Sequence, residues 1–417
     1  MPDAEELITD AVAASRGNDV RLAERQLDRL VVGTGAADGA AAVDAALLRR
    51  LAAAVGRLWP RGWQPVDLDR IASRRLGPRA ARLLRDAVAA QRRGQPDPVP
   101  AWWDDQLRDL DARVWWDDDA RHLTGWATRE GTDRIAALRE AVEALALVES
   151  LPPIAVLRPP PGSAQSVASG PVGRSGSRIL DRVRALLAKA ESTTFPAEAE
   201  ALTGKAQELI ARHSVDAALL AAETPRADLP GGVRLGTDQP YAGAKALLVQ
   251  EVAGANGCES VWSDDLGFAT VLGWPADLAA VELLYTSLLV QATGAMLRGR
   301  NERRATSAGR RTKGYDEAFL HAFALRIGER LRAASAAVNA QAAQEAGAER
   351  LLPVLAARGE AVKERLDNLF PGVTRARLTV RDAEGWASGT SAADRASLDV
   401  GGTRPTRQVG GRGRRQR

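Results

Sequence analysis

Apolar positions recur at helical spacing through residues 1–150, and this pattern predicts an N-terminal helical unit. One clear stripe is formed by Leu47, Leu48, Leu51, Val55 and Leu58. Its three- and four-residue steps place these side chains on one face of a helix, and the proline and glycine residues that follow interrupt the pattern. Seven of the ten tryptophans fall in this region. We therefore expect a separate unit with its own core.

A Trp-Trp-Asp-Asp sequence occurs twice in this unit, at 102–105 and 115–118. The interval is too short for a repeat protein, in which each repeat is a complete supersecondary unit. We interpret the two copies as buried aromatic anchors, with a ligand-stacking surface as the alternative.

Residues 151–176 are rich in proline, then in glycine and serine, and have no apolar period. This composition is typical of a linker that is stiff at first and flexible afterwards.

Two short amphipathic helices follow, and together they predict a helical hairpin over residues 177–220. The first covers 178–190, with Ser177 as a possible cap. The second covers 197–212 after Pro196, which suits a first helical turn because its missing N–H costs nothing there. We expect the two helices to pack antiparallel around one shared core of Leu186, Leu187, Leu202 and Leu209.

The pattern then changes to short strands followed by long helices, which predicts an α+β domain over residues 230–402. Strands are expected at 232–237, 258–263 and 267–272, with a turn at Asp264 and Asp265 between the last two. Helices are expected from Pro275 to about Arg298 and from Tyr315 to about Ala342. An alternating stretch at 373–381 predicts one more strand, and the tail at 403–417 has nothing to bury and is expected to be disordered. The fold class is thus mainly α with a small α+β domain, in which a short antiparallel sheet is backed by long helices.

The stretch 178–216 contains Leu-Leu-Ala-Lys-Ala, then Glu-Ala-Glu-Ala, then Lys-Ala-Gln-Glu-Leu. In order and spacing these three pieces resemble the helical hairpin of a bacterial family, domain of unknown function 2786. The region after it is similar to the segment that accompanies this hairpin, domain of unknown function 7168, through Gly273–Asp277, Tyr315, Phe319–Phe323, Gly385 and Gly389. The resemblance implies a fold and no reaction.

Composition adds a bacterial, GC-rich signature and an expected location. Of the 57 basic residues 52 are arginine. The single cysteine, Cys258, cannot form an intrachain disulfide, and residues 1–20 lack the basic-then-apolar order of a secretion signal. We expect a cytoplasmic protein without a membrane role, because no apolar run approaches the roughly 18 residues needed to span a bilayer.

Motifs for common chemistries are missing, so no metal or cofactor is expected. The three histidines, His122, His213 and His321, form no His-Glu-x-x-His motif, and no glycine-rich run has a P-loop ending. His213 is expected near a helix C-terminus, where its charge suits the dipole. Cys258 is expected to be a buried hydrophobe. Whether the chain is an enzyme stays open, and a site near His321, Tyr315 and Cys258 in the 230–402 domain is one alternative.

The net charge of +4 arises from the tail, since 403–417 holds six arginines and no acid and the rest of the chain has two more acidic than basic residues. Within that remainder, one acid, Glu302, accompanies a cluster expected to be an exposed loop between two helices: Arg298, Arg300, Arg303, Arg304, Arg310, Arg311 and Lys313.

Clustered cations with a single acid among them favour phosphate contact, so the leading hypothesis is a nucleic-acid-associated or regulatory protein that contacts DNA or RNA. Arg375 and Arg377 on one face of the 373–381 strand would extend this surface. A weaker candidate is a helix-turn-helix outline around Leu76-Gly77-Pro78, with arginines from Arg70 to Arg85. The remaining alternative is a protein-interaction module in which the charged face of the hairpin binds a partner protein.

Overall fold

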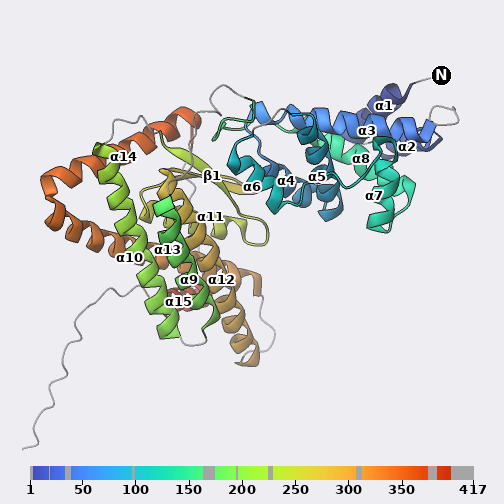
Figure 1. The fold of residues 1–417 in the computed structure, drawn as a ribbon. Helices are drawn as coiled ribbons and strands as arrows, with labels where there is room; N and C mark the ends of the chain where they lie inside the picture. Colours follow the sequence, from blue (N-terminus) through green and yellow to red (C-terminus); the bar gives the residue numbers. More distant parts are fainter. Residues whose placement is uncertain are drawn as a thin grey trace, which may run out of the picture.

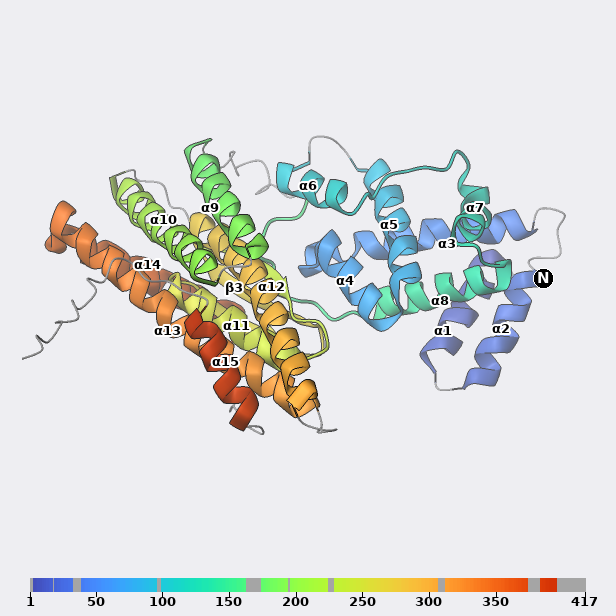
Figure 2. The ribbon, with the colours of Figure 1, turned by 90° about the horizontal axis from the view of Figure 1, so that it is seen from below.

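A computed structural model describes residues 3–17, 19–32, 39–95, 99–162, 174–193, 196–223, 229–306, 312–373 and 383–395. Within these ranges the protein is mainly helical, and its apolar side chains form two large cores. One draws on residues from Leu7 to Leu151, the other on residues from Val183 to Ala393. Figures 1 and 2 show the corresponding units side by side, with β1 on the side of the second unit that faces the first.

The described part of the first unit contains α-helices and two 3-10 segments: α1 (Ala4–Arg16), α2 (Val20–Val32), α3 (Gly39–Gly56), η1 (Trp59–Arg61), α4 (Pro65–Arg75), α5 (Pro78–Arg93), α6 (Ala101–Asp109), η2 (Asp119–Arg121), α7 (His122–Glu130) and α8 (Arg134–Ser150). Asp3 and Glu6 form a capping box that starts α1, and proline opens both α4 and α5. The predicted stripe on α3 lies in the core, as expected.

The tryptophans of this unit are mostly core residues, which confirms the interpretation as aromatic anchors for Trp103 and Trp116. The rings of Trp59 and Trp103 meet edge to face with centroids 5.0 Å apart. Trp102 and Trp115, the first residues of the two repeated motifs, are only half-buried.

The second unit combines a small sheet with long helices: α9 (Arg174–Ser192), α10 (Pro196–Glu223), β1 (Gly231–Gly236), α11 (Ala242–Ala255), β2 (Glu259–Ser263), β3 (Phe268–Gly273), α12 (Pro275–Thr306), α13 (Thr312–Ala346), α14 (Ala348–Leu369) and α15 (Ala383–Arg395). The described strands form one antiparallel sheet in the order β1-β3-β2, with Val271 of β3 opposite both Val233 and Ser260. All of β3 is buried, because it is the central strand and α11, α12 and α14 all contact it. The predicted strands and the turn at Asp264 and Asp265 are confirmed to within a residue.

The hairpin is present as α9 and α10, but its core differs from the predicted one. Leu187 is buried, as expected, whereas Leu186, Leu202 and Leu209 are half-buried. The buried positions include Val183 and Ala190 on α9 and Thr203, Ala206 and Gln207 on α10. The buried face of α10 differs from the predicted one because this helix packs against α13 as well as against α9.

Several predicted helix boundaries are wrong, because the helices continue past the local signals in the sequence. Helix α9 begins at Arg174, so Ser177 is not its cap, and α10 continues to Glu223, which leaves His213 inside the helix. Helix α12 runs to Thr306 and α13 starts at Thr312. Helices α14 and α15 were not predicted. The expected strand at 373–381 and the tail at 403–417 lie outside the described residues, apart from Val373.

Helix α12 is long and apolar enough over Pro275–Asn301 to cross a membrane by length and composition. The expectation that the chain has no apolar run of that length is therefore wrong. Its apolar side chains Leu278, Val281, Leu284 and Leu288 are buried in the core of the second unit. Packing inside a folded domain therefore accounts for the composition of this helix.

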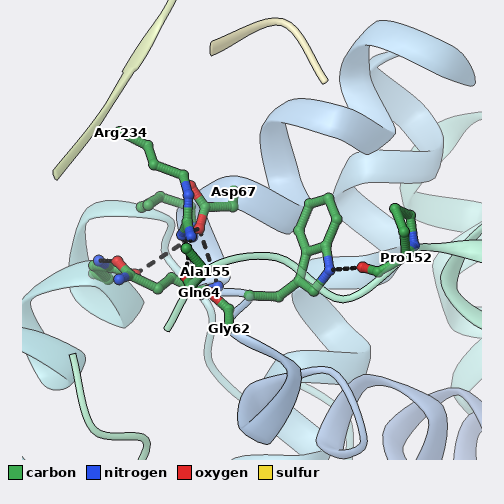
Figure 3. Close-up of polar contacts among 9 residues, drawn as sticks. Gly62, Gln64, Asp67, Pro152, Ala155 and Arg234 are labelled. Carbon is green, nitrogen blue, oxygen red and sulfur yellow. Dashed lines mark hydrogen bonds and ion pairs between the residues drawn. The ribbon is translucent and has the colours of Figure 1, made fainter. Parts of the chain in front are cut away.

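The two units meet at a buried ion pair between Arg234 of β1 and Asp67 of α4 (Figure 3). Their side chains are 3% and 4% exposed, and Arg234 Nη1 lies 2.7 Å from Asp67 Oδ2. The guanidinium also donates to the carbonyl oxygens of Gly62 (3.1 Å) and Ala155 (2.5 Å). Burial raises the pKa of the Asp67 carboxyl, although Arg234 and the Gln64 backbone N–H favour its charged form. Because the cost of burying both charges offsets much of their attraction, the pair specifies the geometry of the contact more than it adds to the stability of the protein.

Residues 151–157 follow this contact and are held by both units, so the first part of the predicted linker is packed. Trp63 donates its indole N–H to Pro152 O at 2.8 Å, and Ile154 N donates to Arg61 O at 2.9 Å. Leu157 is buried against Leu272 and Val362 of the second unit. The chain is therefore anchored on either side of Ala155, whose carbonyl oxygen accepts a hydrogen bond from Arg234.

We predict that Asp67→Asn lowers the free energy of unfolding by about 3–5 kcal/mol, because Arg234 would keep a buried charge without a counter-ion. Asp238→Asn is the matched control: it removes the carboxylate of the half-buried pair with Arg70 at the same interface, which is far more exposed than Asp67, and should cost about 1 kcal/mol. Urea unfolding of the full chain measures both. Equal, small losses would show that the buried pair does not hold the units together.

A second comparison tests the revised hairpin core. Leu187→Asp should cost at least about 3 kcal/mol, because it places an unpaired carboxylate among apolar side chains. Ala188→Asp puts the same group at the next, exposed position of α9 and should change stability by less than about 0.5 kcal/mol. Similar melting temperatures for the two variants would mean that the buried face of α9 is wrongly assigned.

Candidate nucleic-acid interface

The predicted basic cluster lies where α12 leaves the core and α13 returns. Met296 is the last buried residue of α12 among the side chains that the structure describes, and Leu297 and Arg298 are exposed. The helix nevertheless continues to Thr306, and α13 begins six residues later. In Figures 1 and 2 this end of α12 lies at one extremity of the second unit. The expectation of a loop starting at Arg298 is therefore corrected: five of the seven basic positions are helical, 298, 300, 303 and 304 in α12 and 313 in α13. We call the helical ends 297–306 and 312–316 the tip.

Arg300 is engaged within the protein. Its Nη1 lies 3.2 Å from Asp316 Oδ2 on α13, and the Asp316 side chain is 1% exposed. Tyr241, at the start of α11, donates its hydroxyl to the same oxygen at 2.8 Å. Burial, together with the hydrogen bond to Asp316 and its negative charge, raises the pKa of Tyr241 to about 12. The three side chains hold the start of α13 against α11 and α12, so the guanidinium of Arg300 serves the fold.

Arg298 differs from Arg300 in having no acidic partner among the side chains that the structure describes. The side chains of Arg303, Arg304 and Lys313 lie outside that description, as do Arg310, Arg311, Arg375 and Arg377 entirely. Among its described side chains the tip thus presents one exposed arginine, Arg298. The other cations are assigned to this surface only because they are close to Arg298 in the sequence.

The helix-turn-helix outline exists as α4 and α5, but its arginines bind partners within the chain. Arg70 pairs with Asp238, and Arg74 donates to the carbonyl oxygen of Asp264. The side of α4 that carries these arginines therefore lies against the turns of the sheet. A Cβ at Gly236 would lie 1.6 Å from Arg70 Nη1, which shows how closely β1 approaches this helix. The remaining arginines bind as follows: Arg75 to Asp265 O, Arg79 to Glu140, Arg82 to Glu130 and Arg85 to Asp69.

The structure describes the surroundings of each residue of the alternative enzyme site. Cys258 is buried, as predicted, and burial raises the pKa of its thiol, so the reactive thiolate is disfavoured. His321 is half-buried with its Nδ1 2.9 Å from Glu317 O, and burial lowers its pKa. Among the described residues no hydrogen bond joins this thiol to an imidazole. Tyr315 is buried beside Phe319 on α13.

A polar layer beneath the hairpin was missed. Gln207 of α10 is fully buried, and its Nε2 donates to Asn256 Oδ1 (3.1 Å) and Ser335 Oγ (2.9 Å). Ser335 in turn donates to Ala255 O. These bonds tie α10 to the end of α11 and to α13. The available signal was the occurrence of Thr203 and Gln207 on the same stripe as Ala206 and Ile210, since polar residues on an apolar stripe need buried partners.

Beside this layer lies a cavity of about 160 Å³, walled in part by Trp274, Asp277 and Arg358. Arg358 Nη2 is 3.2 Å from Asp277 Oδ2, and its guanidinium lies over the Trp274 ring at 4.5 Å. Burial raises the pKa of Asp277 although Ser214 and Arg358 favour its charged form. The arrangement joins α14 to the start of α12.

Comparison with family models gives one match, the family described as protein of unknown function (DUF2786), at residues 178–217. The match spans most of α9 and α10 and confirms the hairpin resemblance. Comparison with curated proteins and with solved structures gives no match.

We predict that Arg300→Gln destabilises the protein by about 2 kcal/mol, because it removes the cation beside the buried Asp316 carboxylate. Arg298→Gln, two residues earlier on the same helix, should change the free energy of unfolding by less than about 0.5 kcal/mol. Urea titrations of both variants test the distinction between a structural and an available arginine. A larger loss for Arg298→Gln would contradict it.

Proposed function

We propose that the protein associates with nucleic acid by contacting phosphates through the tip of α12 and α13. The observation that carries the proposal is that α12 continues for nearly three turns beyond Met296, the last buried residue among its described side chains. Arg298, Arg300, Arg303 and Arg304 belong to this helical extension, with Glu302 as its one acid. Only Arg300 is paired in the described part.

Electrostatics favours an anionic partner here. Like charges gathered on one helix end repel one another, and phosphates would relieve that repulsion while releasing their own counter-ions. Arginine suits the task because its planar guanidinium donates to phosphate oxygens in a fixed fork. A helix holds the charges at constant spacing, so less ordering is needed on binding than in a loop. Backbone phosphates carry little sequence information, so the proposed contact serves DNA or RNA without marked sequence preference.

We also infer that the region after the hairpin corresponds to domain of unknown function 7168 and that the chain is bacterial. The bacterial inference rests on the arginine-rich composition. The support for the inference about the region after the hairpin is the pair Gly385 and Gly389. A Cβ at these positions would lie 2.4 Å from Tyr315 O and 2.1 Å from Phe319 O. The glycines therefore let α15 pack directly on the backbone of α13, where the resemblance places Tyr315 and Phe319–Phe323.

The proposal predicts salt-dependent binding to a short generic DNA duplex and to a single-stranded RNA. With four to five phosphates contacted, log K should fall by roughly 4 units per tenfold rise in salt on duplex DNA. Replacing Arg303, Arg304, Arg310 and Arg311 with glutamine should reduce that slope to about 1 or less, with little change in melting temperature. Fluorescence anisotropy at several salt concentrations measures the slope.

Deletion of 403–417 is the required control, since six tail arginines could produce a similar slope alone. The proposal expects the truncated chain to keep most of its affinity. If truncation abolished binding while the four glutamines left the slope unchanged, the tip would play no part in it.

A further inference from the structure

The cavity of about 160 Å³ beside the polar layer is a second candidate site. It is lined by residues of α10, α13 and α14 and by others at the end of α11 and the start of α12. Two wall residues, Ala211 and Ser214, belong to the stretch that matches the hairpin family. An apolar cavity of comparable volume binds benzene. The space is therefore sufficient for one small, flat molecule between the hairpin and α14.

The described wall of this cavity has no net charge. Its charged side chains are Asp277 and Arg358, which pair with each other at 3.2 Å and are 6% and 14% exposed. Ser214 also hydrogen-bonds to the Asp277 carboxyl. A charged ligand would lose its hydration here and would meet one group of like sign in this pair, so nothing would compensate its burial. The cavity therefore favours a neutral ligand.

Asn339 of α13 contributes an amide without a partner in the chain. The residue lines the cavity and is half-buried, and its side chain forms no hydrogen bond with any group that the structure describes. Its two polar atoms are not among those sealed from solvent, so a ligand can reach both. A carboxamide offers an N–H donor beside a carbonyl acceptor, and the group that matches both at once is a second amide.

Arg358 supplies further donors at the same cavity. Its Nη2 is engaged with Asp277, whereas its Nε and Nη1 have no acceptor among the described residues and are likewise not sealed. The guanidinium is held in place, because it lies over the Trp274 ring as well as beside the carboxylate. Apolar surface for the rest of a ligand comes from Ala211, Ala255 and Leu355.

We propose that this cavity binds a small neutral carboxamide with a flat apolar body. The ligand amide would hydrogen-bond to the Asn339 amide, and its carbonyl oxygen, which has a second lone pair, would also accept from Arg358. The neutral charge follows from the paired Asp277 and Arg358, and the amide follows from the accessible polar atoms without partners. The site lies toward the end of α13 that is opposite the tip, so it is separate from the proposed contact with nucleic acid.

A ligand-observed NMR titration of the full chain with benzamide tests the assignment, with the similarly shaped anion benzoate as the comparison. Benzamide should bind the more tightly, because benzoate would bring a second carboxylate beside Asp277. Asn339→Ala removes the amide, and Asn339→Asp keeps its shape but replaces the donor with an acceptor. Each change should weaken benzamide binding by about tenfold, the effect of losing one or two hydrogen bonds. Gln344→Ala removes an exposed amide of α13 outside the cavity wall and is the matched control, which should bind as the parent does.

Melting temperatures show that each variant is folded, and if Asn339→Ala is not, Asn339→Asp carries the test. No binding of benzamide to the parent protein would overturn the proposal, since the cavity would then hold water alone. Equal affinity for benzoate would also overturn it, as would unchanged affinity in the Asn339 variants. Replacement of Asn339, far along α13 from the tip, should leave the salt slope for DNA unchanged. Failure of this proposal is therefore distinguishable from failure of the proposed function.

Discussion

The buried ion pair of Arg234 and Asp67 joins strand β1 of the second unit to helix α4 of the first. Neighbouring carbonyl oxygens accept hydrogen bonds from the same guanidinium. Its guanidinium binds a carboxylate and two carbonyl oxygens, and one of those carbonyls, Ala155, belongs to the segment that connects the units. A charge buried in this way is costly unless every partner is in place. The contact therefore has one low-energy geometry, and β1, α4 and residues 151–157 adopt it together.

This geometry determines which arginines remain available. Once β1 lies on α4, Arg70 and Arg74 bind the turns of the sheet, and the helix-turn-helix outline has little charge left to offer a phosphate. At the other end of the second unit, α12 extends beyond its core-packed part, and of its described arginines only Arg300 is needed to neutralise a buried carboxylate. The proposed function follows from this contrast between arginines that complete the fold and arginines that do not.

Local signals in the sequence were sufficient for the strands, the turn at Asp264 and the hairpin, because alternation and turn residues act over a few positions. They failed where a distant segment decides. The end of α12 at Thr306 has no local marker, and the buried face of α10 is set by α13, which put Gln207 inside and Leu202 at the margin. The basic cluster was found from charge alone, yet the pairing of Arg300 with Asp316 depends on how two helices pack.

Photo-crosslinking measures the location of the proposed contact most directly. The full chain would be bound to a duplex that carries photoreactive groups along its backbone, irradiated, and digested for peptide mass spectrometry. The account predicts crosslinked peptides from residues 298–313 and none from α4 or α5. Crosslinks concentrated in α4 and α5 would contradict it, because they would show that the arginines at the interface between the units are available to nucleic acid after all.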